Sequence, residues 1–191
     1  MLACYSIDMN DFTVAQLEAI VHKLERVQLS GANLSRSNLI RANLFGAILN
    51  KADLHQANLR GANLGSTQLR EADLSGAKMD PTYLIRADLS GANLQNANLQ
   101  NAVMNGANLT AANMRETYLI NTKMNGSNLC KADLRGAIMD SAKLVKADLR
   151  GANLQNANLQ NTNLTNAKFD GDTKWPKDFD PEAAGAVLMD H

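Results

Sequence analysis

Aromatic side chains are scarce in this sequence, where Phe, Tyr and Trp make up 4% of the 191 residues. A core built around a few large rings is therefore excluded, and small and medium aliphatic side chains must fill the interior. No apolar run approaches the ~18 residues that a membrane span requires. The start, MLACYSIDMND, lacks the basic and apolar regions of a secretory signal. We therefore expect a cytoplasmic protein that does not contact a membrane.

Residues that could form a reactive centre are few and widely separated. The two cysteines, Cys4 and Cys130, have no partner at metal-ligand or disulfide spacing, which fits a reducing compartment. The three histidines, His22, His55 and His191, cannot converge on one metal ion. The glycines do not form a phosphate-binding loop that leads into a helix. We predict no catalytic, cofactor or metal site, and hence no enzyme.

A large aliphatic residue recurs at every fifth position, from Leu29 through Leu34 and Leu39 to Phe169, without a change of phase. A small residue, usually alanine, stands two positions before each one. Five residues advance a helix by ~500°, so the leucines would be scattered around the cylinder and no helix can use this pattern. In an extended chain, residues two apart share a face, so the alanine and the leucine point inward together. The residue between them, which we call the ladder residue, points outward.

The two remaining residues of each unit, which we call the corner residues, are rich in Gly, Asn, Ser and Gln and suit turns. The chain is therefore expected to coil, with neighbouring coils paired ~4.8 Å apart as strands are. Residues 75–102 also align with residues 135–162 without gaps, at an offset of 60. This duplication supports a coil of 20 residues, because an offset of three whole coils preserves the faces.

Runs such as ADLSGANLQNANL resemble the A-[DN]-L-x-x motif of the pentapeptide-repeat family, and the resemblance covers 29 consecutive units over residues 27–169. It implies an all-β solenoid: a right-handed quadrilateral β-helix of four pentapeptides per coil and about seven coils. The chain then divides into an N-terminal segment 1–26, the β-helix 27–169 and a C-terminal cap or tail 170–191.

Both ends of such a solenoid need covering, because each exposes the apolar core and open backbone groups. Before the repeats, an amphipathic capping helix is expected to begin after Thr13. Its apolar stripe comprises Val14, Leu17, Ile20, Val21 and Leu24. After the repeats, Trp175 and Phe179 are expected to cover the last coil, and the tail resembles the extension of some cyanobacterial family members. Residues 183–189 either complete this lid or form a homodimer contact, so the protein is a monomer or a homodimer through a terminal cap.

Two functions remain. The first is a non-enzymatic structural or interaction protein that presents a rigid four-sided rod to a protein partner. The second follows from the family resemblance, because quinolone-resistance members resemble the B-DNA rod in shape and negative charge and bind DNA gyrase. Residues 27–169 hold nine acidic and fifteen basic residues, a net charge of about +6. This sign disfavours a DNA mimic, and we expect no direct contact with nucleic acid.

One side of the predicted rod, which carries Leu44 and every twentieth residue after it, combines aliphatic groups with cations. Exposed aliphatic groups next to unpaired cations would suit an acidic, partly apolar partner. The alternative is an ordinary solvated surface. The candidate partner face comprises Tyr83, Ile85, Arg86, Val103, Lys123, Lys143, Val145 and Lys146.

Overall fold

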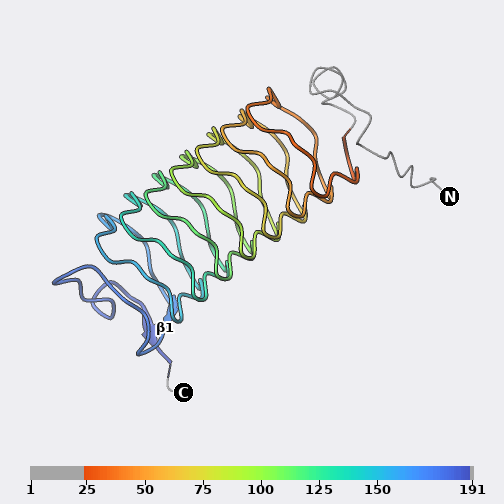
Figure 1. Cartoon of the computed structure of the whole chain (residues 1–191). Helices are drawn as coiled ribbons and strands as arrows, with labels where there is room; N and C mark the ends of the chain where they lie inside the picture. Colours follow the sequence, from red (N-terminus) through yellow and green to blue (C-terminus); the bar gives the residue numbers. More distant parts are fainter. Residues whose placement is uncertain (1–23, 190–191) are drawn as a thin grey trace.

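The computed structural model describes residues 24–189. These residues form a stack of coils that runs from Leu24 at one end to the C-terminal segment at the other (Figure 1). Within residues 24–189, two segments form strands longer than one residue, β1 (Lys168–Phe169) and β2 (Val187–Leu188), and they pair in parallel. Elsewhere each coil contributes single-residue bridges. The described part of the chain contains no helix, and so no helix there is long and apolar enough to cross a membrane.

The coils are held in register by parallel bridges between ladder residues 20 positions apart. Gln28 bridges Ile48, Asn33 bridges Asp53, and the same step continues to Asp148 and Lys168. Since four ladder positions fall within each 20 residues, the bridges form four rows along the stack. Each bridge contains two backbone hydrogen bonds in opposite directions. The N–H of Leu29 donates to the carbonyl of Ile48, and the N–H of Ile48 donates to the carbonyl of Val27. The 20-residue step expected from the sequence is thereby confirmed.

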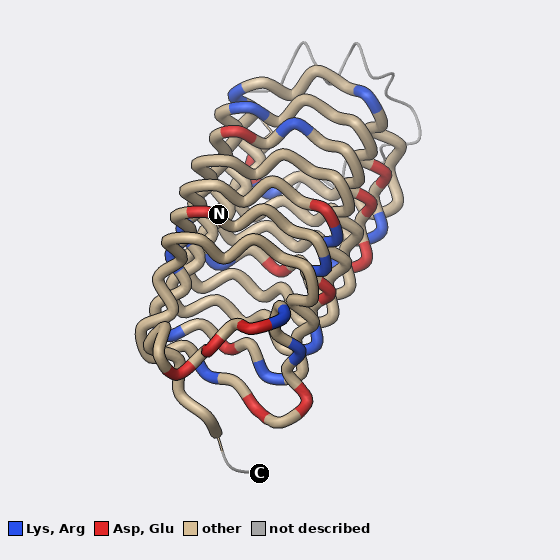
Figure 2. The backbone as a smooth tube through the Cα atoms, turned by 90° about the vertical axis from the view of Figure 1, so that its left-hand side faces the viewer, with Lys and Arg blue, Asp and Glu red and all other residues tan. Residues whose placement is uncertain are grey.

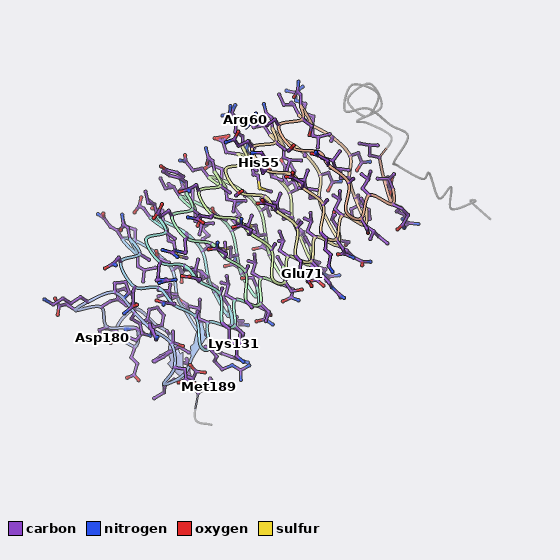
Figure 3. All side chains as sticks on the ribbon, in the orientation of Figure 1. His55, Arg60, Glu71, Lys131, Asp180 and Met189 are labelled. Atoms are coloured by element: carbon purple, nitrogen blue, oxygen red, sulfur yellow. The ribbon has the colours of Figure 1, made fainter. Side chains whose placement is uncertain are left out.

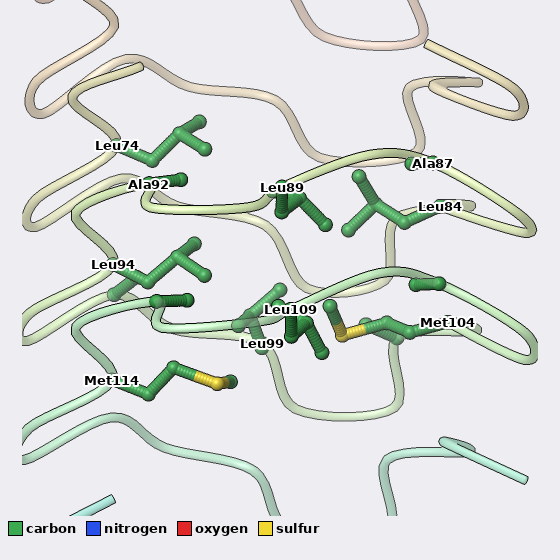
Figure 4. Close-up of a cluster of buried hydrophobic side chains, with 14 of the residues drawn as sticks. Leu74, Leu84, Ala87, Leu89, Ala92, Leu94, Leu99, Met104, Leu109 and Met114 are labelled. Atoms are coloured by element: carbon green, nitrogen blue, oxygen red, sulfur yellow. The ribbon is translucent and has the colours of Figure 1, made fainter. Parts of the chain in front are cut away.

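The interior is a continuous column of aliphatic side chains. All 29 large residues predicted to point inward, from Leu29 to Phe169, are at most 8% exposed. Figure 4 shows how they stack between coils, with Leu84 above Met104 and Leu74 above Leu94 and Met114. The buried Thr82 and Thr122 donate their hydroxyls to the carbonyls of Leu59 and Leu99, so these polar residues replace alanine without leaving an unpaired group.

The second corner residue of each unit adopts positive φ, whether or not it is glycine. From Arg26 to Asn166 this holds at every such position except Pro81, whose ring fixes a negative φ. Glycine relieves the strain at some corners, for example Gly91 at 67°, whereas Ala111 adopts 55° despite its Cβ. The coil geometry therefore imposes the positive φ at each of these corners, and the residue type changes only the strain of adopting it.

The repeat begins one unit earlier than the sequence pattern suggested. Leu24, expected on the capping helix, is 2% exposed and belongs to the core. A turn follows it, and Arg26 donates its backbone N–H to the carbonyl of Phe45 in the next coil. The rest of the expected helix lies outside the described residues.

At the other end, the pattern continues with a change of step. Asn153 bridges Lys174, 21 positions later, and Lys168 pairs with Val187, 19 positions later. Thr173 and Trp175 therefore occupy the small and large positions of a further unit. Trp175 and Phe179 pack against the core as expected, and their rings stack at a centroid distance of 5.3 Å.

The tail expected to be either a lid or a dimer contact has two parts. Ala186 is 6% exposed and belongs to the core, whereas Val187 and Leu188 are 44% and 48% exposed. The segment therefore contributes to the lid and also leaves apolar surface at the end of the stack.

Candidate partner surface

Four of the predicted face residues lie next to one another in a single row of bridges. This row, which we call the Tyr83 row, consists of Asn43, Asn63, Tyr83, Val103, Lys123, Lys143 and Asn163. Tyr83 is 47% exposed, both lysines are exposed, and Val103 is half-buried between Tyr83 and Lys123. The structure thus brings together, on consecutive coils, side chains that are 60 residues apart in the sequence.

The other four predicted residues lie at the corner that follows this row. Ile85 is 44% exposed and Arg86 is exposed, and both are in the same unit as Tyr83. Val145 and Lys146 lie three coils further along, and Val145 is half-buried. The surface therefore has its apolar part at Tyr83 and Ile85 and its densest positive charge on the later coils.

Asparagine and aspartate at the ladder position stabilise the following turn, and the Tyr83 row has other residues at four of its positions. Wherever the ladder residue from Asn33 to Asn163 is Asn or Asp, its Oδ1 accepts the backbone N–H of the first corner residue. Such a bond stabilises the turn by about 1 kcal/mol. The Tyr83 row lacks it on four consecutive coils, from Tyr83 to Lys143. No other row in the described chain loses it over so many.

Two of the four corners recover the bond from the neighbouring coil. The side chain of Asn105 accepts the backbone N–H of Asn125 at 3.0 Å, and that of Asn125 accepts the N–H of Val145 at 3.1 Å. This relay keeps the backbone in place while Lys123 and Lys143 occupy the ladder positions. The five-residue pattern does not predict this relay, although the Asn-Gly pairs at both corners are a sequence signal for it.

The cations of the surface have no acidic partner. Among the ion pairs of residues 24–189, none involves Arg86, Lys123, Lys143 or Lys146. Other parts of the stack hold close pairs, such as Arg70 with Asp88 and Arg150 with Asp148, both at 2.6 Å. Absence of an ion pair is not confined to this surface, because Lys78 and Lys168 also lack one in the described chain.

The acid-free character of the face is interrupted at its start. Since Leu24 belongs to the core, Glu25 occupies the first corner of the row, one coil before Phe45. The ring of Phe45 lies close over Gly65, where a Cβ would approach it to 3.1 Å. The acidic group is therefore three coils from Ile85, and the surface between Tyr83 and Lys146 has no carboxylate.

Groups elsewhere in the described residues do not assemble into a reactive centre. No cluster of three or more His, Cys, Asp or Glu side chains there could hold a metal ion. His55 lies toward one end of the stack and Asp180 toward the other (Figure 3). Burial raises the pKa of the Cys130 thiol, and a hydrogen bond to Asp148 raises it further, so this thiol is less easily ionised than a free cysteine.

Comparison with solved structures finds other stacked-coil proteins. The chain is 40% identical to Rfr23, a pentapeptide repeat protein from the cyanobacterium Cyanothece 51142. That match has a TM-score of 0.48, covers 49% of this chain and spans 63% of Rfr23. HetL, a pentapeptide repeat protein involved in heterocyst differentiation regulation from Nostoc sp. strain PCC 7120, is 31% identical over 75% of this chain and 72% of its own, at a TM-score of 0.42.

QnrB1, a plasmid-mediated fluoroquinolone resistance protein, gives a TM-score of 0.62 with 17% identity. The match covers 88% of this chain and 84% of QnrB1, and it supports the fold alone. Curated protein sequences yield no match. The profile of the pentapeptide repeats family, by contrast, matches eight copies. The matched segments are 23–61, 47–80, 82–117, 112–151 and 140–171, so the chain belongs to the pentapeptide repeat family.

Proposed function

We propose that this protein is a non-enzymatic interaction protein of the cytoplasm, whose right-handed, four-sided rod presents the surface around the Tyr83 row to a protein partner. The observation that carries the proposal is the loss of the Asn or Asp turn bond on four consecutive coils. The replacing side chains stabilise the turn less than asparagine would, and three of them, Tyr83, Lys123 and Lys143, are exposed. Contact with another molecule explains their presence.

Rigidity supports the same proposal. Ladder bridges and inward leucines fix the backbone beneath each exposed side chain, so this surface loses little backbone freedom when a partner binds. Contact surfaces on solenoids are commonly formed in this way, by residues repeated along one face.

A gyrase-binding DNA mimic is the second candidate, and the charge of the rod opposes it. A surface that imitates DNA must present negative charge to the basic groups that bind DNA. The Tyr83 row and its corner instead present Arg86, Lys123, Lys143 and Lys146 without a neighbouring carboxylate.

The experiment compares two matched pairs of substitutions. Tyr83→Ala with Ile85→Ser alters the unit TYLIR, whereas Tyr118→Ala with Ile120→Ser alters the nearly identical unit TYLIN in another row. Tyr118 is 42% exposed, close to the exposure of Tyr83. Both double variants should keep a melting temperature within a few degrees of wild type, because exposed substitutions have small effects.

Partner retention is then measured with immobilised protein and a low-salt lysate of the organism that makes it. We expect the Tyr83 variant to lose the proteins that wild type retains, and the Tyr118 variant to keep them. Equal retention by both variants, or equal loss, would contradict the assignment of the contact to this surface.

A further inference from the structure

We infer that the partner segment is an extended acidic peptide that runs along the rod axis, with one apolar side chain seated at Tyr83 and Ile85 and carboxylates at Lys123 and Lys143. This inference rests on the proposed function and specifies the chemistry of its partner.

The charge of the surface determines the sign of the occupant. Lys123 and Lys143 occupy the same row on adjacent coils, ~4.8 Å apart along the axis. Neither forms an ion pair in the described chain, and Arg86 and Lys146 add further positive charge at the corner. Like charges this close repel one another, and an acidic partner would relieve that repulsion.

The apolar part of the surface requires one apolar side chain in the occupant. Tyr83 and Ile85 are 47% and 44% exposed in the same unit, and Val103 lies beside Tyr83 in the row. The unit TYLIN shows that this apolar pair is not unique, but the corner residue on its next coil is Asp140, whereas the corresponding residue after TYLIR is the uncharged Asn105. At Tyr83 the apolar pair shares its unit with Arg86, and Lys123 and Lys143 follow in the same row.

The spacing of the coils sets the spacing within the peptide. Lys123 and Lys143 are two and three coils from Tyr83, which corresponds to ~10 and ~14 Å along the axis. An extended peptide advances ~3.3 Å per residue. Side chains two and four residues apart share a face of such a peptide. Carboxylates two and four residues after the apolar side chain, at ~7 and ~13 Å, therefore face the rod within reach of Lys123 and Lys143.

A peptide suits this surface better than a nucleic acid does. Single strands bind through several aromatic side chains on which successive bases stack. The Tyr83 row has one aromatic residue, Tyr83, and continues with an aliphatic residue and two lysines.

The test measures binding of a fluorescein-labelled peptide, GSFSESEGGS, to the full chain by anisotropy in 50 mM NaCl. Lys123→Gln with Lys143→Gln should weaken binding about fivefold, which corresponds to two exposed charge contacts. The matched control, Lys78→Gln with Lys168→Gln, removes two ladder lysines from other rows and should change affinity less than about twofold.

A second charge variant, Arg86→Gln with Lys146→Gln, keeps the test valid if the ladder variant fails to fold, and it should also bind the peptide more weakly. Equal effects of ladder and control variants, or no binding to wild type, would overturn the inference. Tighter binding of oligo(dT) or phosphatidylserine vesicles than of the peptide, lost in the Lys123→Gln, Lys143→Gln variant, would also overturn it. So would self-association of wild type in sedimentation that this variant loses. If the peptide fails while the Tyr83 variant still loses its cellular partner, the peptide inference is wrong and the proposed function stands.

Discussion

At the scale of single residues, the same pentapeptide position serves both the coil and the surface. Asn or Asp at the ladder position closes the corner with its side-chain oxygen, as Asp73 does for the N–H of Ser75 at 2.9 Å. An asparagine there can also donate its side-chain amide to its neighbour in the row, as Asn93 does to Asp73 at 3.0 Å. Replacing such a residue gives up turn stability for a different exposed side chain, so departures from Asn and Asp identify candidate contact residues.

The positive φ of the corners leads to a prediction at Ala111. Its φ of 55° strains an L-residue, and its side chain is exposed, so Ala111→Gly should raise stability by about 0.5–1 kcal/mol. Its neighbour Ala112 is buried and has no positive φ, so Ala112→Gly should lower stability by about 1–2 kcal/mol. Urea unfolding measures both changes. Two shifts of the same sign would contradict the corner geometry.

The carboxylate of Asp148 predicts how stability responds to acid. Hydrogen bonds from the Arg150 guanidinium, the closest at 2.6 Å, lower the pKa of Asp148 to about 2 despite partial burial. An unfolded aspartate has a pKa of about 3.9, so the unfolded chain binds a proton first as the pH falls. Stability from this group is therefore complete above about pH 4 and is lost as the pH falls toward 2.

Thermal unfolding between pH 7 and pH 2 tests this expectation. Asp148→Asn keeps an oxygen for the corner N–H of Arg150 but removes the charge. The variant should melt lower than wild type at pH 7, and the difference should shrink as the pH approaches 2. A constant difference across this range would show that the ion pair does not contribute.

Much of this residue-scale detail could be predicted from the sequence, and some could not. Every inward residue from Leu29 to Phe169 followed from a period of five, because burial requires the same spacing in each unit. The relay through Asn105 and Asn125 did not, because the acceptor lies 20 residues from its donor and only the stacking of coils brings them together.

At the scale of elements, each coil is a set of short bridges and corners rather than long strands. Single bridges are weak alone, so the order of a coil depends on its two neighbours. The C-terminal end of the described stack has a neighbouring coil on one side, and the structure adds bonds there. Asp170 accepts the N–H groups of Gly151 and Thr173, at 2.9 and 3.0 Å, together with the Thr173 hydroxyl.

These bonds accompany the change of step in the C-terminal segment. Burial raises the pKa of Asp170, but the hydrogen bonds from Gly151, Thr173 and Asp172 together lower it by more, so the net shift is downward. The five-residue period does not predict this change of step, because one extra residue places Thr173, Lys174 and Trp175 out of phase with the leucines. The triplets T-K-W and A-V-L, read as small–ladder–large, could have revealed both added units.

Asp170→Ala should therefore loosen the C-terminal segment without affecting the central coils. We expect amide hydrogen exchange to quicken about tenfold or more over residues 170–189, because several bonds to one carboxylate are lost together. Amides near Leu99 should exchange at the wild-type rate. Uniform loss of protection along the whole chain would contradict the view that the end is held separately.

At the scale of the whole molecule, charge is distributed unevenly between the rod and its C-terminal end. The rod carries a net charge of about +6, whereas the segment after Phe169 holds a run of acidic residues (Figure 2). Asp170, Asp172, Asp178, Asp180 and Glu182 lie in this segment. The net charge of zero for the whole chain therefore conceals a positive coil surface.

This distribution leads to the prediction that the protein does not act on DNA gyrase as a DNA mimic. A mimic must compete for a site that attracts phosphates, and a positive rod is repelled from such a site most strongly at low salt. In a gyrase supercoiling assay at 50 mM potassium glutamate, we expect no inhibition by submicromolar protein, and no increase when salt is lowered further. The charge variant Lys123→Gln with Lys143→Gln should be equally inactive, since it leaves a net positive rod. Inhibition by submicromolar wild-type protein would show that shape outweighs the sign of the surface charge.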